Sequence, residues 1–220
     1  MRFALNFSDL IPYWDILLAG VIFTIVLTAV STVAGVALGT ACAWARTFGP
    51  GRLGGLTRAY IELIRNTPFI VQLFFIFFGL PALGVKLNET MAAFLAMVIN
   101  LGAYSAEIIR AGIQAVPKGH IEAGDSLAMS RFEIFRHIVL KQAFQKVYPA
   151  LSSQIIIVML GSSVVSQISA EDLTYAANFV QSRNFRAFEA YVVAAFIYLL
   201  LAIMARFILR GVGRRVFPRS

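Results

Sequence analysis

The chain has 220 residues, of which 59% are hydrophobic and 14% are charged, and its formal net charge is +8. Ordinary soluble domains carry about 25% charged residues, so this composition excludes a typical soluble domain and indicates several membrane spans. The basic balance does not indicate a nucleic-acid partner, because the charges fall in the gaps between apolar runs. The one cysteine, Cys42, excludes a disulfide framework or a thiolate metal cluster within the chain.

The first apolar run follows a polar lead that ends in Tyr13 and Trp14. It extends without a charge from Ile16 to Ala45, more than the roughly 20 residues needed to cross a bilayer. A cleaved signal peptide would have an apolar core of about 7–15 residues, so this run is predicted to be a retained span. The five predicted spans of one transmembrane domain, 1–220, cover residues 16–45, 68–83, 90–109, 147–170 and 190–209.

Small residues recur every fourth position in the first run, at Ser31, Gly35, Gly39 and Ala43. Such a stripe allows another helix to approach closely, and we expect it to be a packing face. Chance in a span rich in alanine and glycine is the alternative.

The segments between the apolar runs differ in their predicted structure. Residues 46–65 are predicted to be a polar connection, followed by a helix that Asn66 or Thr67 caps and Pro68 begins. The third helix is expected to end near Val116, before Pro117. Residues 171–189 are predicted to be a polar loop.

Charge asymmetry sets the predicted direction of the five spans. The first connection, a charged segment at 117–146 and the C-terminal tail are rich in lysine and arginine. The N-terminal lead, the link around Lys86 and Glu89, and the 171–189 loop are neutral or slightly acidic. The positive-inside rule therefore predicts an outside N-terminus and a cytoplasmic C-terminus.

The charged segment between the third and fourth runs is predicted to form two helices. The first covers residues 120–129 and the second begins at Ser130, which with Glu133 fits a capping box. The pair is expected to lie along the membrane surface as a cytoplasmic loop, polar on one side and anchored to the bundle on the other.

This loop resembles the cytoplasmic EAA loop of ATP-binding-cassette (ABC) transporter permeases. Glu122, Ala123, Ile138 and Leu140 match the motif at its spacing. Three residues depart from it: Gly124, Ala128 and Lys141. Ala128 weakens the case for a turn with positive φ, and Lys141 favours a second helix that continues where the motif has proline.

Two further stretches resemble the polar amino-acid uptake family of ABC permeases. One is Arg65 to Leu73 with the Phe78-Gly79-Leu80-Pro81 that follows, and the other is Ala103 to Ile113. The similarity covers nearly the whole chain. It implies an all-α integral membrane protein with the type I ABC importer permease fold and a coupling-helix loop.

The resemblance also implies a function and partners. The chain would be the permease subunit that moves a polar amino acid inward across the bacterial cytoplasmic (inner) membrane by alternating access. It would not be an enzyme and would hold no cofactor, and it lacks a G-x-x-x-x-G-K-[ST] phosphate loop. ATP and Mg²⁺ would bind to a cytoplasmic ATPase subunit, and the other partners would be a second permease copy or a paralogue, an extracytoplasmic amino-acid-binding protein and membrane lipid. The residues expected to couple to the ATPase are Glu122, Ala123, Gly124, Asp125, Leu127 and Ala128.

Uncharged polar residues within the spans are the candidates for contact with substrate. They are Gln72, Asn100, Tyr104, Gln154, Ser163 and Gln167. For each of them a hydrogen bond between helices is the alternative role.

Other functions remain as alternatives. No ionisable residue lies in the middle of a predicted span, which argues against the runner-up, an ion-coupled secondary transporter or channel. A non-transporting membrane scaffold is the third class. His120 and Glu122 form an H-x-E pair, but without P-C-x-x-C it does not indicate a metal site.

Overall fold

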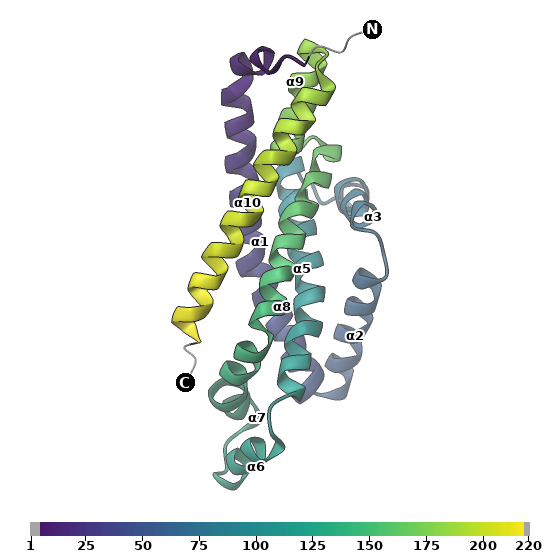
Figure 1. Cartoon of the computed structure of the whole chain (residues 1–220). Helices are drawn as coiled ribbons and strands as arrows, with labels where there is room; N and C mark the ends of the chain where they lie inside the picture. The colour runs from purple at the N-terminus through teal and green to yellow at the C-terminus, as the bar shows by residue number, and fades with distance from the viewer. Residues whose placement is uncertain (1–4, 218–220) are drawn as a thin grey trace.

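The computed structural model describes residues 5–217, and every regular element among them is a helix. The elements form an elongated bundle (Figure 1). The 3₁₀ helix η1 (Phe7–Tyr13) and α9 (Leu173–Asn184) lie at one end, called here the α9 end. Helix α6 (Lys118–Ser126) and the last turns of α10 (Ala187–Val216) lie at the other, the α6 end. The all-α prediction is confirmed.

Four helical stretches among the described residues are long and apolar enough to cross a membrane. They cover Phe7–Phe48, Glu89–Gln114, Arg131–Ile168 and Ala187–Val216. A bent pair, Gly51–Arg65 with Phe69–Ala82, supplies a fifth crossing if it counts as one span. The five predicted spans agree with this arrangement in order, and they agree in number when the bent pair is counted as one span.

The centre of the bundle is the contact between α1 (Trp14–Phe48) and α5 (Glu89–Gln114). Ser31, Gly35 and Gly39 on α1 are buried, which confirms that the predicted stripe is a packing face. A Cβ on Gly39 would lie 2.6 Å from Ser105 Cβ and 2.8 Å from the backbone nitrogen of Ala106. The missing side chain therefore sets how closely the two helices approach.

The second crossing differs from the prediction. Residues 46–65 are not a polar connection, because α1 continues to Phe48 and α2 occupies Gly51–Arg65. Beyond it, α3 (Phe69–Phe74), a π-helical segment η2 (Phe75–Gly79) and α4 (Leu80–Ala82) meet α2 at 112°. Helix α2 is amphipathic and buries Ile61 and Ile64 while its arginines stay outside. The prediction missed it because a search for apolar runs passes over an amphipathic helix.

The predicted cap at this break is also wrong. Pro68 is the N-cap residue of α3 and gives it no side-chain cap. Asn66 Nδ2 instead donates to Glu62 O at 2.7 Å, and Thr67 Oγ1 donates to Leu63 O at 2.8 Å. Both side chains therefore close the end of α2.

The fourth crossing begins earlier than residue 147. One continuous helical stretch runs from α7 (Arg131–Glu133) through a π-helical segment η3 (Ile134–Val139) and α8 (Leu140–Gly161) to the 3₁₀ helix η4 (Ser162–Ile168). The second loop helix and the fourth span are thus one rod, as the lysine at position 141 indicated. A displacement at α7 can therefore act on the membrane part of the bundle.

The predicted polar loop at 171–189 contains a packed helix. Helix α9 buries Leu173, Ala176, Ala177 and Val180, a spacing of i, i+3, i+4 and i+7 that typifies an amphipathic helix. At its N-cap, the fully buried Asp172 accepts hydrogen bonds from Tyr175 N and from Tyr198 Oη, both at 2.8 Å. Asp172 lies between η4 and α9, outside every predicted span. A search for charged residues within the spans therefore does not find this buried carboxylate.

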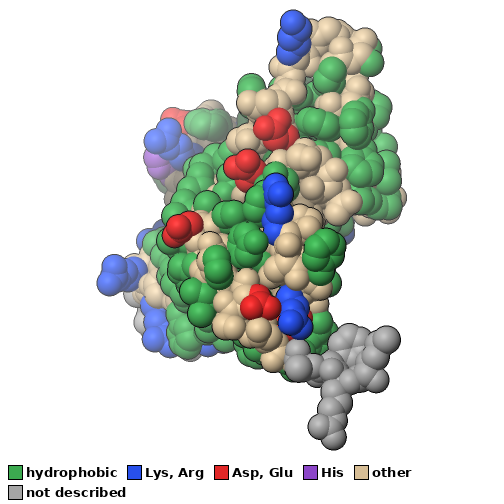
Figure 2. Space-filling model, turned by 90° about the horizontal axis from the view of Figure 1, so that it is seen from above, with side chains coloured by type: hydrophobic (Ala, Val, Ile, Leu, Met, Phe, Trp, Pro, Cys, Tyr) green, Lys and Arg blue, Asp and Glu red, His purple; other side chains and the backbone are tan. Residues whose placement is uncertain are grey.

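The two ends of the bundle differ in charge. The α1–α2 turn, the α6–α7 loop and the last turns of α10 all lie in the half of the bundle toward the α6 end (Figure 1). Those are the three segments that the sequence shows to be basic. Figure 2 looks onto the opposite end, where acidic side chains lie beside basic ones.

Candidate functional site

Helix α6 ends in a tight turn that aims its last residues away from the bundle. Met129 N donates to Gly124 O at 3.1 Å and Ala128 N donates to Asp125 O at 3.0 Å, the pair of bonds that defines a Schellman motif. The residue at the bend of that motif adopts a left-handed backbone, and here Ala128 has φ 55°. The expectation that alanine argues against a positive-φ turn is wrong.

The six predicted coupling residues divide into two groups. Glu122, Ala123, Asp125, Leu127 and Ala128 are exposed, and Leu127 is 76% exposed although it is apolar. These five residues are called here the α6 surface. Gly124 is buried and faces the bundle, where a Cβ would lie 2.8 Å from Ile134 Cγ1 and 2.9 Å from Ile138 Cδ1. Gly124 therefore acts through packing and not through the α6 surface.

The α6 surface is held by the helix that follows it. Ser130 N donates to Glu133 Oε2 at 2.7 Å and Glu133 N donates to Ser130 Oγ at 3.3 Å, so the predicted capping box is confirmed. Ile134 and Val139 are fully buried in a cluster with Ile109 and Ile113 of α5.

Aromatic contacts tie the same region to α1. The rings of Trp44 and Phe132 are 6.2 Å apart, and those of Phe48 and Phe135 are 5.9 Å apart. These contacts join α1 to α7 and to η3, the two segments that follow the α6 surface along the chain.

An ion-pair cluster joins α1 to α5 near the same end. The Glu107 carboxylate accepts from Arg46 Nη1 at 2.8 Å and also from the guanidinium of Arg110. Arg110 lies one turn from Glu107 on the same helix, whereas Arg46 is a partner from α1. Arg46 lies in the last turn of α1, 61 positions before Glu107, and the sequence alone does not show that these two helix ends are neighbours.

Three of the predicted path residues meet in one place. Asn100, Tyr104 and Gln154 line a hollow of about 430 Å³ between α3, α5 and α8. The other lining residues are Thr67, Pro68, Phe69, Met97, Ile157, Val158 and Gly161. The lining contains uncharged polar groups and apolar side chains and no acid or base.

The remaining path candidates lie elsewhere. Gln72 is buried beside the α2–α3 break, where its Nε2 donates to Ile64 O at 2.7 Å and to Thr67 O at 3.0 Å. Its Oε1 accepts from Asn100 Nδ2 at 3.0 Å. Ser163 and Gln167 belong to η4 and do not line the hollow. For Gln72 the alternative role, a hydrogen bond between helices, is the one the structure supports.

No group of three histidine, cysteine, aspartate or glutamate side chains in residues 5–217 could hold a metal ion. His120 instead contacts Gln142, with its Nδ1 2.8 Å from Gln142 Oε1.

Residues 35–218 match the family model described as "Binding-protein-dependent transport system inner membrane component". The chain belongs to this family. As a member, the permease is a membrane subunit of an ABC transport system, and ATP hydrolysis resides in a partner subunit. This placement does not favour the ion-coupled alternative.

Curated relatives of the permease extend along almost its whole length. The glutamine transport system permease protein GlnP of Escherichia coli (strain K12) is 33% identical over 213 residues, which cover 96% of this chain and 97% of the relative. The L-cystine transport system permease protein TcyB of Bacillus subtilis (strain 168) is 36% identical over 205 residues, which cover 93% and 88%.

Solved structures share the fold of the permease. A chain in the crystal structure of an amino acid ABC transporter with histidines matches with a TM-score of 0.86 and 35% identity, covering 97% of this chain and 100% of that chain. A chain of the MetNI methionine ABC transporter in an inward facing conformation matches with a TM-score of 0.76 at 20% identity, covering 94% and 98%. The second likeness concerns the fold alone.

Proposed function

We propose that the α6 surface docks into a cytoplasmic ATPase subunit and that this contact drives import of a polar amino acid. The observation that carries the proposal is the exposed set of Glu122, Ala123, Asp125, Leu127 and Ala128 at the tip of an anchored helix. The proposal also explains why Leu127, an apolar side chain in this otherwise polar helix, is 76% exposed in the isolated chain.

The substrate class follows from the hollow and from the relatives. The relatives' names refer to glutamine and cystine transport, and the hollow offers an amide at Asn100, an amide at Gln154 and a phenol at Tyr104. An uncharged lining favours an amino acid with a neutral polar side chain, because a net charge in a site of low dielectric needs an opposite charge. An extracytoplasmic binding protein would deliver the substrate, and a second permease copy or paralogue would complete the path.

The mechanism is alternating access with the N-terminus outside and the C-terminus inside. ATP binding would draw two ATPase subunits together and displace the α6 surface. The cluster around Ile134 and the continuous α7–α8 rod would pass the motion to α1, α5 and α8. The hollow would then open alternately to the two sides of the membrane. The basic character of the α6 end supports its cytoplasmic placement.

The test reverses one charge on the α6 surface. We expect Glu122→Arg to lower amino-acid uptake and transport-coupled ATP hydrolysis by at least about tenfold. A partner surface that complements a carboxylate would then face a positive charge, and such a mismatch costs several kcal/mol of binding free energy. The amount of permease in the membrane should stay unchanged, since Glu122 is exposed.

Glu171→Arg is the matched control, because Glu171 is also an exposed acid but lies in the connection before α9. Normal uptake and coupling in Glu122→Arg would refute the docking role. Equal losses in both variants would show that charge reversal acts through something other than docking.

A further inference from the structure

A second concave site lies between α8 and α10 at the α6 end, apart from the hollow. It is a groove of about 1300 Å³. Its lining comprises Gln145, Tyr148, Pro149, Ser152, Ser153, Ile156, Ile157, Leu160, Arg206, Arg210, Gly213, Arg214 and Phe217. None of the residues of the α6 surface and none of the predicted path residues lines this groove, and Ile157 is the residue that it shares with the hollow.

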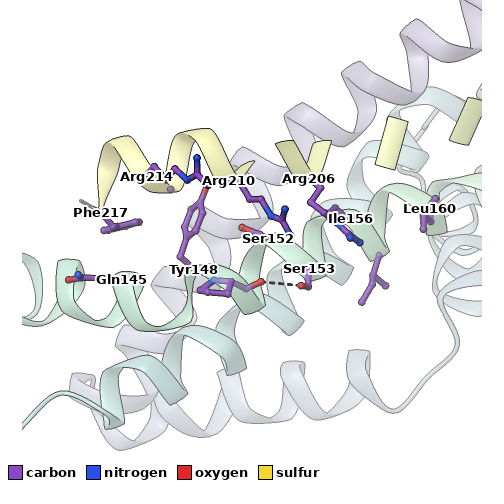
Figure 3. Close-up of a pocket in the computed structure, with 13 residues that line it drawn as sticks. Gln145, Tyr148, Ser152, Ser153, Ile156, Leu160, Arg206, Arg210, Arg214 and Phe217 are labelled. Carbon is purple, nitrogen blue, oxygen red and sulfur yellow. Dashed lines mark hydrogen bonds between the residues drawn. The ribbon is translucent and has the colours of Figure 1, made fainter. Parts of the chain in front are cut away.

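Three arginines form one wall of the groove. Arg206, Arg210 and Arg214 follow at intervals of four residues, which places them on one stripe of α10. Figure 3 shows the side chains of Arg206 and Arg210 between the α10 and α8 ribbons. No acid lines the groove, and none of the three forms an ion pair with any of residues 5–217. Like charges at this spacing repel each other, and a bound anion would offset that repulsion.

The other end of the groove is apolar. Ile156, Ile157 and Leu160 continue the lining along α8, and Ile157 is 59% exposed in the isolated chain. Arg206 is the first charge after Glu189 on α10, and the 16 residues between them span about 24 Å at 1.5 Å per residue. A hydrocarbon core is about 30 Å thick, so Arg210 and Arg214, one and two turns further along α10, reach the level of the lipid headgroups, and the long side chain of Arg206 can extend to it. The groove thus runs from a cationic headgroup level to an apolar interior.

The floor of the groove is rigidly built. Tyr148 Oη donates to Leu209 O at 2.6 Å, which fixes α8 to α10. The Tyr148 ring lies over Gly213, where a Cβ would be only 2.4 Å from Tyr148 Cε1, and its centroid is 5.5 Å from that of Phe217. These contacts hold the two helices at the spacing that leaves the groove open above them.

We propose that this groove binds an anionic phospholipid from the cytoplasmic leaflet. The phosphate would lie among Arg206, Arg210 and Arg214, with the hydroxyls of Ser152 and Ser153 within its reach, and an acyl chain would follow Ile156 and Leu160. Basic pockets between membrane helices on the cytoplasmic side suit such headgroups. A second copy of this chain fits the charges less well, because a two-fold contact through the groove would bring arginines against arginines.

The experiment measures lipid binding to the full permease purified with its ATPase partner. Phosphatidylglycerol and phosphatidylcholine are titrated separately, and bound lipid is counted by native mass spectrometry. We expect phosphatidylglycerol to bind and phosphatidylcholine not to compete with it. Each of Arg206→Gln, Arg210→Gln and Arg214→Gln should weaken phosphatidylglycerol binding about fivefold.

Two variants serve as controls. Arg215→Gln removes an exposed arginine from the same turn of α10 that does not line the groove, and it should leave binding unchanged. Arg210→Lys keeps the charge and should retain most of the binding. Equal affinity for the two lipids, or an Arg215→Gln effect as large as that of Arg210→Gln, would overturn the proposal. So would a Ser153→Cys permease that forms a disulfide-linked dimer through the groove.

Discussion

The left-handed backbone of Ala128 predicts that Ala128→Gly stabilises the turn between α6 and α7. At φ 55° the Cβ of an L-residue lies too close to the neighbouring carbonyl, at a cost of roughly 1–2 kcal/mol. Glycine removes that strain but adds unfolded-state entropy worth about 0.5–1 kcal/mol. The net stabilisation should be about 0.5–1 kcal/mol.

Amide hydrogen exchange in the full permease measures this change locally. The Met129 N–H, which donates to Gly124 O, should exchange about two- to fivefold more slowly in Ala128→Gly. Ala123→Gly is the matched control, because Ala123 is exposed in the interior of α6, where glycine costs about 0.5–1 kcal/mol. Exchange at Leu127 N, which donates to Ala123 O, should become faster in that control.

Two results would contradict the reasoning. If Met129 exchanges at the same rate or faster in Ala128→Gly, the left-handed geometry carries no strain that glycine relieves. If Ala128→Gly and Ala123→Gly shift exchange in the same direction, the effect comes from glycine itself and not from the backbone angle.

Two further substitutions test the core and the break. Gly39→Ala should destabilise the permease by about 1–3 kcal/mol in thermal unfolding, since its Cβ would meet Ser105 and a backbone atom on α5, whereas Gly211→Ala, with nothing within 4 Å, should be neutral or stabilising. Similar melting temperatures for the two variants would argue against α1–α5 close packing.

Gln72→Leu should lower the free energy of unfolding by about 1–3 kcal/mol, because Ile64 O loses its buried donor. An unchanged melting temperature, matching that of exposed Gln167→Leu, would show that Gln72 does not hold the break.

Hydropathy and local chemistry determined much of this protein. The long spans could be predicted because charged groups are costly in hydrocarbon, so charge-free runs mark the crossings. The capping box at Ser130 and Glu133 could be predicted because it involves residues only three apart, whose bonds do not depend on the rest of the fold. Most of the α6 surface followed from the resemblance of the loop to a known motif.

The tertiary structure decided the features that depend on distant residues. Pro68 disfavours a helical backbone at the residue before it, but the 112° bend is held by Gln72, whose partner Asn100 lies 28 residues away. Packing likewise buried Gly124 against Ile134 and Ile138, and the left-handed backbone of Ala128 is a conformation that no local preference of alanine indicates.

The hollow and the groove show the same division. Sequence could nominate Asn100, Tyr104 and Gln154 as polar residues in apolar spans, but it could not separate them from Gln72, because only the packing of α3, α5 and α8 places three of the four around one space. The arginine stripe of α10 was visible as a basic tail. Its role as one wall of a groove exists only because Tyr148 and Gly213 hold α8 and α10 at a fixed spacing, and that spacing arises from contacts between residues 65 positions apart.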